Sequence, residues 1–451
     1  MIESVIFFFS GSGMVMLFIL FMRINVVGSK SKLVKHRSKE PGFVDLLIYA
    51  SVVDDGVIVG KDGSLMAAWA YQGVDSNSST EAERDQVSLQ INHALSRMGS
   101  GWMIHIDAVR KPAPGYSAKD DSHFPDPVSA AIDEERREFF ERVGTLYESN
   151  YVITATYLPP LLAQQKFVEL MFDDEGVPVD SKTRTIALLN HFKRECANIE
   201  SHLSSVFRMK RLKGKTITKE DNSSVNYDAF LRWIQFCISG LDHPVILPKN
   251  PIYLDALLSG QEFWGGVVPK IGQNFIQVVS IEGFPLASSP GLINSLADLP
   301  CLYRWSTRFI FMDTHEAVGH LEKFSKKWKQ KIRSFFDQVF NAHSSNVDQN
   351  AINMVSDAQA AIAETNSGEV AQGYYTSVVV LMSESRGDLE ASARQVAKAI
   401  NHLGFTARIE TINTIDAYLG SLPGHGVENV RRPLLNTMNL ADLMPSNTVW
   451  P

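Results

Sequence analysis

The feature that most constrains the fold is a tight-turn signal between two apolar runs near the start of the chain. Val57–Val59 and Leu65–Tyr71 have strand length, and Asp62-Gly63 lies between them. An Asp-Gly pair readily adopts the positive φ angles of a tight turn, so the pattern predicts a β-hairpin. Helices and strands then alternate along the chain. A hairpin followed by such alternation indicates an α+β fold with a mixed or antiparallel sheet.

A first α+β subdomain is predicted for residues 41–158. Its first helix covers about Glu81–Met98, with Ser79 or Thr80 as N-cap and Gly99 after its end. The other elements expected here are a strand at Trp102–Val109, a polar loop at Pro112–Pro127, a helix at Val128–Val143 and a strand at Tyr151–Tyr157.

Residues 159–266 are predicted to form a mainly helical region, with helices near Thr183–Leu203 and Asp228–Ile238. A second α+β subdomain follows at 267–420. Its predicted strands are Phe275–Ile281, Tyr303–Met312, Tyr375–Met382 and Thr406–Glu410, and its helices are Glu316–Phe340, Ala351–Thr365, Asp388–Asn401 and a short one near Ile415. The expected fold class is therefore α+β: two α/β subdomains with mixed or antiparallel sheets around a helical middle region, preceded by one N-terminal apolar helix.

The N-terminal segment, residues 1–40, is predicted to be a membrane-anchor helix and a basic juxtamembrane linker. Val5 to Met22 are apolar or small, about the minimum length for a spanning helix. Basic side chains follow and Glu3 is the only charged one before the run, so the positive-inside bias places the rest of the chain on the cytoplasmic side. Because Ser10-Gly11-Ser12-Gly13 lowers the hydrophobicity, an interfacial or partner-bound helix is an alternative, and a cleaved signal peptide is another.

Composition limits the classes of function. A net charge of -7 and a pI near 6.0 argue against a surface built as a whole for nucleic acid, so no direct sequence-specific nucleic-acid binding is predicted. Cys196, Cys237 and Cys301 are isolated from one another and lack the spacing of zinc or redox motifs. They are interpreted as reduced, mostly buried thiols of a cytoplasmic protein.

Three short motifs resemble catalytic ones and are interpreted as structural. Gly214-Lys215-Thr216 resembles the end of a phosphate loop, but Met209 stands where that motif needs a glycine, which favours a solvated basic hairpin. Asp313 ends an apolar strand as in a Walker B motif, and is interpreted as capping the next helix. His315 and His320 are five residues apart, one too many for a shared zinc ion. No catalytic, cofactor-binding or metal-binding residue is predicted.

A run of basic residues at Lys323–Arg333, which includes Lys326 and Lys327, offers a candidate interaction surface. Its apolar residues share one helical stripe, which predicts that they form the core and that the lysines form the opposite, solvated face. A docking patch for an acidic partner or an anionic lipid is the alternative, because the charge has one sign. The predicted stripe consists of Phe324, Trp328, Ile332, Phe335 and Val339.

The C-terminal residues, 421–451, are predicted to be a linker that leads toward a further domain. Leu422-Pro423-Gly424 has the composition of a turn, since proline restricts φ and glycine allows a sharp change of direction. Arg431 and Arg432 are candidates for pairing with carboxylates of a following domain or of a neighbouring subunit. The sequence therefore suggests a junction at this end of the chain.

Three motifs together resemble the TrbE family of conjugal-transfer ATPases of type IV secretion systems, which is related to the VirB and CagE ATPases. The resemblance extends from about Pro41 to the C-terminus and follows the non-catalytic N-terminal region of that family. The motifs are Tyr303–Asp313, Gly373–Met382 and the stretch from Leu422 to Asn436.

The resemblance implies an N-terminal docking and assembly region that couples a motor to the inner-membrane complex, for transfer of DNA or protein or for pilus assembly. The implied partners are inner-membrane components of the secretion system and further copies of the chain, at the cytoplasmic face of the bacterial inner membrane. In the family a motor domain with the phosphate loop follows this region. ATP and magnesium are therefore expected only for the full-length family, and this chain is predicted not to hydrolyse ATP alone. The alternative is a stand-alone, membrane-tethered structural subunit without ATPase activity.

Overall fold

The computed structural model describes residues 42–73, 78–159, 179–218, 224–248, 252–285, 287–339, 349–429 and 431–446, without the side chains of 179–184, 328–339 and 349–353. The predicted apolar helix at Val5–Met22 lies outside these residues. Within the described ranges, no helix has both the length and the apolar character needed to cross a bilayer. The chain divides into two units, 1–47 and 48–451. The first contributes the short helix α2 (Phe43–Leu46), where the Asp45 carboxylate accepts a hydrogen bond from the Gly42 N–H.

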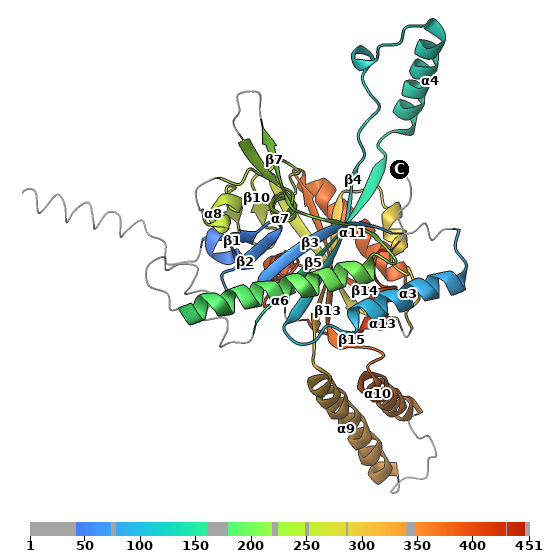
Figure 1. Cartoon of the computed structure of the whole chain (residues 1–451). Helices are drawn as coiled ribbons and strands as arrows, with labels where there is room; N and C mark the ends of the chain where they lie inside the picture. Colours follow the sequence, from blue (N-terminus) through green and yellow to red (C-terminus); the bar gives the residue numbers. More distant parts are fainter. Residues whose placement is uncertain are drawn as a thin grey trace, which may run out of the picture. The chain divides into compact units, whose positions relative to one another are not determined.

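A single antiparallel sheet organises the second unit (Figure 1). From one edge, its strands are β1 (Tyr49–Asp54), β2 (Val57–Gly60), β3 (Leu65–Gln72), β5 (Tyr147–Tyr157), β4 (Trp102–Pro112), β12 (Tyr303–Phe311), β13 (Gln372–Ser383), β11 (Asn274–Gly283), β10 (Lys270–Ile271) and β9 (Phe263–Trp264). Three short strands extend this order: β6 (Arg208–Arg211) pairs with β3, β14 (Thr406–Ile409) with β11, and β15 (Leu434–Asn436) with β13.

The two predicted α+β portions meet inside this sheet. Strand β12 pairs with β4 from Tyr303↔Arg110 to Ile310↔Met103, without a register shift. The α+β class and the antiparallel pairing are confirmed, whereas the separate sheets expected for the two portions are replaced by one. Pairing removes an exposed edge from each half, and unpaired strand edges are unfavourable features of a sheet.

Helices cover both faces of the sheet. One face packs on a large apolar core together with residues of α3 (Glu81–Leu95), α6 (Val179–Leu203), α11 (Arg386–His402) and α13 (Thr437–Asp442). The opposite face carries α7 (Ala229–Ser239), α8 (Leu254–Leu258) and α12 (Thr414–Leu419), and the short 3-10 helices are η1 (Lys119–Asp121) and η2 (Asn294–Asp298). Successive strand residues point to opposite faces, so each central strand serves two environments.

Local signals were good predictors of these elements. The hairpin is confirmed: β2 and β3 are antiparallel with Ile58 opposite Met66, and Gly63 has a φ of 80°. Helix α3 begins at a capping box, where the Thr80 hydroxyl accepts from the Glu83 N–H and the Glu83 carboxylate accepts from the Thr80 N–H. The cysteines in the described part of the chain are free and buried.

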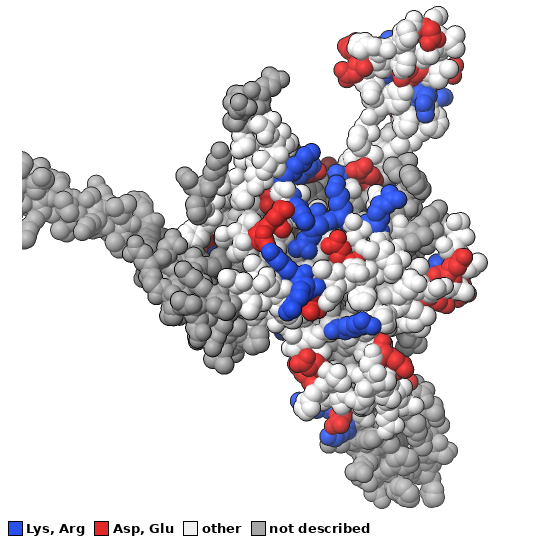
Figure 2. Space-filling view, in the orientation of Figure 1, with Lys and Arg blue, Asp and Glu red and all other residues white. Residues whose placement is uncertain are grey.

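The middle region contains strands that its predicted helical character did not include. Besides β6, it holds the two-stranded hairpin of β7 (Gly214–Thr218) and β8 (Ser224–Asp228). These strands are short and polar, so they lack the alternation that marks a half-buried strand. Arg208 and Lys210 of β6 are exposed, and Figure 2 shows a concentration of Lys and Arg side chains over this part of the sheet.

Helices α9 (Thr314–Val339) and α10 (Gln349–Ser367) form the predicted helical pair, and in the described part of α9 one residue of the predicted stripe, Phe324, is not buried. Phe324 is 45% exposed, whereas Ala317, Leu321 and Ser325 are buried. The rest of the predicted stripe lies outside the described side chains. In the first half of α9 the buried residues are instead an i, i+4 series that includes a serine, because packing selects the face that meets a neighbouring element.

The predicted linker at 421–451 is, over its described residues, an integral part of the fold. Leu422, Leu440 and Leu443 are buried, β15 pairs with β13, and α13 packs against α3. Pro and Gly residues made this stretch resemble a linker. In the structure they shape turns that fold it back onto the sheet, as at Gly424, where φ is 88°.

The close approach of β12 and β13 leads to a test of the central packing. A Cβ atom added to Gly373 would collide with the Phe309 ring and lie 2.6 Å from the Ile310 carbonyl oxygen. We expect Gly373→Ala to lower the free energy of unfolding by about 1–3 kcal/mol, measured by urea denaturation. Gly319→Ala in α9 is the control, because no atom lies within 4 Å of its added Cβ. That change should be neutral or stabilising by up to about 1 kcal/mol. Equal effects of the two changes would contradict the packing described.

Candidate functional site

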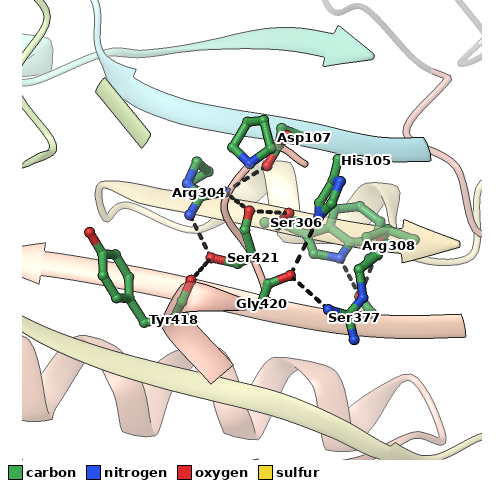
Figure 3. A network of polar contacts seen from close by, with 12 residues as sticks. His105, Asp107, Arg304, Ser306, Arg308, Ser377, Tyr418, Gly420 and Ser421 are labelled. Carbon is green, nitrogen blue, oxygen red and sulfur yellow. Dashed lines mark hydrogen bonds and ion pairs between the residues drawn. The ribbon is translucent and has the colours of Figure 1, made fainter. Parts of the chain in front are cut away.

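A cluster of buried polar side chains lies at the centre of the sheet, on the face opposite the apolar core (Figure 3). Strand β4 contributes His105 and Asp107, and β12 contributes Arg304, Ser306 and Arg308. Alternate positions of a strand share a face, so these five side chains lie on one side of the sheet. Trp305 and Phe309 of β12 enter the apolar core on the other side. Buried charges of this kind require partners, and those partners show what the cluster does.

An ion pair between Arg304 and Asp107 joins β12 to β4. The Arg304 Nη1 donates to Asp107 Oδ1 at 2.8 Å, and the two side chains are 5% and 0% exposed. Burial raises the pKa of the Asp107 carboxyl, and the Arg304 charge partly offsets that increase. Since desolvation of both ions opposes their attraction, the pair contributes more to a defined geometry than to net stability.

The same guanidinium binds the segment that follows α12. Its Nη1 donates to the Ser421 carbonyl oxygen at 2.8 Å, and its Nη2 donates to the Ser421 hydroxyl at 2.6 Å. The Ser421 hydroxyl in turn donates to the Tyr418 carbonyl oxygen, and the Ser306 hydroxyl donates to the Ser421 carbonyl oxygen at 3.1 Å. Arg304 therefore connects two strands and the turn at Ser421.

Arg308 binds this segment through its backbone carbonyls. Its Nη1 donates to the carbonyl oxygens of Gly420, His425 and Glu428 at 3.4, 3.0 and 2.8 Å, and its Nη2 to that of Asn429 at 3.2 Å. Burial lowers the pKa of Arg308 to about 10, and the neighbouring Arg432 charge contributes to that decrease. The guanidinium thus holds a loop closed around it.

The shape of this loop depends on one residue with an uncommon backbone conformation. Asn429 has a φ of 67°, the only positive φ at a non-glycine residue in the described parts of the chain. Asparagine adopts the left-handed region more readily than most residues. The turn at Asn429 directs its carbonyl oxygen toward Arg308, so the backbone conformation at Asn429 supplies one of the acceptors of the buried guanidinium.

Two histidines and a tyrosine complete the cluster. His105 Nε2 lies 3.4 Å from the Gly420 carbonyl oxygen, and burial lowers the pKa of His105 well below its ordinary value, with the Arg308 charge a smaller cause. The Tyr49 hydroxyl donates to the Pro423 carbonyl oxygen at 2.8 Å, and its ring meets the His425 ring edge to face. Because its pKa is lowered, His105 is neutral near pH 7.

We call these contacts the clamp: the hydrogen bonds of Tyr49, Arg304, Ser306 and Arg308 that hold the segment Tyr418–Arg431 on the sheet, together with the Asp107 carboxylate that pairs with Arg304. Its two guanidinium groups are directed at carbonyl oxygens and a carboxylate of the same chain, so its arrangement is that of a structural connection. Within the described residues, no group of three or more His, Cys, Asp or Glu is placed to bind a metal ion.

The candidate residues from the sequence occupy separate elements. Arg431 lies beside the clamp, where it contacts the Glu410 carboxylate and lies 2.9 Å from that of Glu282, so it pairs within its own chain. Arg432 donates to the Val427 carbonyl oxygen at 3.1 Å. On α9, Lys326 and Lys327 are both exposed, and Lys326 lies 3.4 Å from Glu322.

The three catalytic-like motifs are in structural positions. Gly214-Lys215-Thr216 is part of β7 in an antiparallel hairpin, which differs from the loop between a strand and a helix that binds phosphate. Asp313 accepts a hydrogen bond from the Ser100 N–H at 2.9 Å. His320 lies 3.4 Å from the Tyr374 hydroxyl.

Sequence reasoning missed the clamp. Its available signal was the spacing of Arg304, Ser306 and Arg308 inside an otherwise apolar strand, which places three polar residues on one face. That pattern also fits a strand with a solvated face. The acceptors could not be identified, since they are carbonyl groups from a segment more than one hundred residues away along the chain.

Removing one member of the buried ion pair tests the clamp. We expect Arg304→Met to lower the free energy of unfolding by about 3–5 kcal/mol, because it leaves the Asp107 charge buried and unpaired. The double variant Arg304→Met with Asp107→Leu should cost less than the sum of the two single changes, as measured by urea denaturation. Arg408→Met is the control, because the Arg408–Glu282 pair is largely exposed and should cost less than about 1 kcal/mol. Strict additivity would contradict the coupling.

The lowered pKa of His105 predicts how the free energy of unfolding depends on pH. Its folded pKa lies below that of the unfolded chain, so the unfolded state binds the proton first. Stability from this residue is complete above a pH of about 6.5 and falls as the pH drops below it, by at most about 1.4 kcal/mol per pH unit. Unfolding of the wild type and of His105→Gln, measured between pH 7.5 and 5.5, should show a smaller pH dependence for the variant. The same slope in both proteins would show that His105 does not titrate in this way.

Comparison with known proteins identifies the family to which this chain is similar. Residues 56–165 match the N-terminal domain of the type IV secretion system ATPase VirB4/TrbE. Residues 215–431 match the CagE, TrbE, VirB family, a component of the type IV transporter system. The conjugal transfer protein TrbE of Rhizobium radiobacter is 44% identical over 417 residues, which cover 92% of this chain and 50% of that protein.

Two further relatives come from Sinorhizobium fredii, where a probable conjugal transfer protein TrbE occurs as two pieces. The second piece is 45% identical over 260 residues, which are 57% of this chain and 39% of that piece. The first piece is 49% identical over 125 residues, which are 28% of this chain and 84% of that piece. The chain spans about half the length of the R. radiobacter relative. It belongs to the TrbE family of conjugal transfer proteins, components of type IV secretion systems.

Proposed function

We propose that this chain is the docking and assembly region of a TrbE-like secretion ATPase. In this role it couples the motor part of such a protein to the inner-membrane complex, for transfer of DNA or protein or for pilus assembly. The observation that carries the proposal is an exposed apolar helix face on an excursion from the sheet. Family membership supports the assignment to a conjugal transfer apparatus.

The excursion joins two adjacent strands at the centre of the sheet. The β4–β5 ladder ends at the pair Pro112↔Tyr147, and the residues between them include η1 and α4 (Pro127–Val143) (Figure 1). We call residues 113–146 the α4 arm. The Asp126 carboxylate accepts hydrogen bonds from the Val128 and Ser129 N–H groups, so α4 has a defined start.

Large apolar side chains are exposed along the α4 arm. On the helix, Val128, Ile132, Phe139 and Val143 are separated by 4, 7 and 4 residues, so they share one face. Large apolar side chains exposed together on one helix face indicate an interaction site. The exposed fractions are 47% for Phe124, 66% for Val128, 54% for Ile132, 55% for Phe139, 48% for Val143 and 42% for Leu146.

The charges of α4 favour a protein partner over an anionic lipid surface. The helix carries five carboxylates and three arginines, a net charge of 3 − 5 = −2. A helix that binds an anionic membrane surface usually has a basic polar face. We therefore assign the exposed apolar face of the α4 arm to a protein component of the secretion apparatus.

The clamp supports the coupling part of the proposal. It attaches the segment Tyr418–Arg431 to β4 and β12, and β4 continues directly into the α4 arm. A displacement of that segment would therefore act on the strands that carry the docking face. In this proposal the chain lies at the cytoplasmic face of the inner membrane, is tethered by its N-terminal segment and contacts further copies of itself. ATP hydrolysis belongs to the motor part.

Changes on the α4 arm test the docking role. We expect a tagged chain to co-purify with inner-membrane components of the conjugation system from detergent-solubilised membranes. The double variant Ile132→Ser with Phe139→Ser should reduce this recovery about tenfold, because it removes two apolar anchors. The matched control is Ile412→Ser, since Ile412 is 88% exposed and lies outside the arm.

The result has a clear interpretation because both altered positions are on the surface. Circular dichroism and thermal unfolding should be unchanged in the variant. Recovery at the wild-type level from a folded variant would contradict the assignment of the α4 arm. An equal loss with Ile412→Ser would show that the contact is not specific to this helix face.

A further inference from the structure

A cavity of about 480 Å³ lies between the sheet and α7, close to the base of the α4 arm. Its walls come from β3, β4, β5 and β6 on one side and from α7 on the other. Its volume falls within the range of small-molecule sites. The clamp and the exposed face of the α4 arm use other residues, so this cavity belongs to neither.

The cavity carries an excess of positive charge. Lys111, Arg208, Lys210 and Arg232 line it, with Asp242 as the one carboxylate among the lining residues. Asp242 is shared by Arg232 at 2.5 Å and Lys111 at 3.5 Å, and Lys111 also lies 3.3 Å from Glu148. Counting both carboxylates, the surplus is 4 − 2 = 2 positive charges.

Arg208 and Lys210 supply that surplus. They are two residues apart on β6, so they lie on the same side of the strand. Within the described ranges neither forms an ion pair, and both are exposed. Figure 2 shows the Lys and Arg side chains that gather over this part of the sheet.

A buried hydrogen-bond donor in the same wall is without an acceptor. Trp233 lines the cavity and is 9% exposed, and its indole Nε1–H has no hydrogen-bond partner in the described part of the chain. An unpaired buried donor is unfavourable in a protein interior. The Nε1 atom is enclosed by protein, so Trp233 offers the cavity its ring and not its donor.

Aromatic rings form the apolar part of the walls. The Trp233 and Phe236 rings of α7 stack with centroids 5.8 Å apart, and both residues line the cavity. The site therefore combines a cationic side with an aromatic one, which suits a molecule with an anionic group and an apolar or planar portion.

We propose that this cavity binds a small organic phosphate. A phosphate monoester carries a charge of about −1.5 to −2 at neutral pH, which matches the surplus of two positive charges better than a single carboxylate does. Its oxygens accept hydrogen bonds from the guanidinium of Arg208 and the ammonium of Lys210, and its organic part lies against the rings of Trp233 and Phe236. This site goes beyond the proposed docking function and does not depend on it.

Calorimetric titration of the whole chain with phenyl phosphate tests the proposal. We expect saturable binding with one site per chain, and weaker binding of inorganic phosphate, which lacks the aromatic portion. Arg208→Gln and Lys210→Gln should each weaken binding about tenfold, because each removes a charged donor. Lys215→Gln is the matched control: it removes one exposed lysine of β7, outside the cavity, and should change the affinity less than twofold.

A second readout follows the indole directly. In an NMR spectrum of Trp side chains, the N–H resonance that disappears in Trp233→Phe should shift when phenyl phosphate is added to the wild type. If Trp233→Phe does not fold, Arg208→Gln and Lys210→Gln still test the site, because those side chains are exposed.

Three results would overturn the proposal. One is the absence of binding heat with phenyl phosphate, and another is an affinity that Arg208→Gln leaves unchanged. The third is tighter binding of hexaglutamate than of phenyl phosphate, which would assign the cavity to an acidic polypeptide. Co-purification through the α4 arm is measured separately, so failure here would leave the docking proposal standing.

Discussion

Two guanidinium groups buried at the centre of the sheet are the constraint on which the rest of this structure depends. Arg304 has a carboxylate partner in Asp107, whereas Arg308 is surrounded by backbone carbonyls. A buried cation without partners is strongly unfavourable, so the sheet can hold these residues only when the segment Tyr418–Arg431 is in place. The clamp thus makes the C-terminal part of the described chain a condition for the stability of its centre.

The same strands connect the features to which we assign functions. Strand β4 carries Asp107 of the clamp, then Lys111 of the cationic cavity, and then continues into the α4 arm. Strand β5 returns from that arm and contributes Ser149 and Tyr151 to the cavity. A ligand in the cavity and a partner on the arm would both act on this pair of strands. The position of β4 beside β12 extends that connection to the second half of the sheet.

Much of the local structure could be predicted, because it depends on residues close together in sequence. The Asp62-Gly63 turn and the Thr80 cap each require only a few neighbouring residues, and both are present. Predictions failed where one local pattern fits two environments. The apolar row that includes Phe324 resembled a core face but is exposed there, and the Pro- and Gly-rich stretch after Ser421 resembled a linker but folds onto the sheet.

The sequence by itself determined the α+β class, the hairpin, most helices and strands, and a resemblance that the family comparison confirmed. These follow from local backbone preferences and from motifs that occur in a fixed order along the chain. Only the tertiary structure decided that one sheet unites both halves and that Arg304 pairs with Asp107 across 197 residues. It also decided which cations surround the cavity. The physical reason is that a charged residue in a strand can be either solvent-exposed or buried. Burial requires a partner, and that partner can be distant in sequence, so local sequence does not distinguish the two cases.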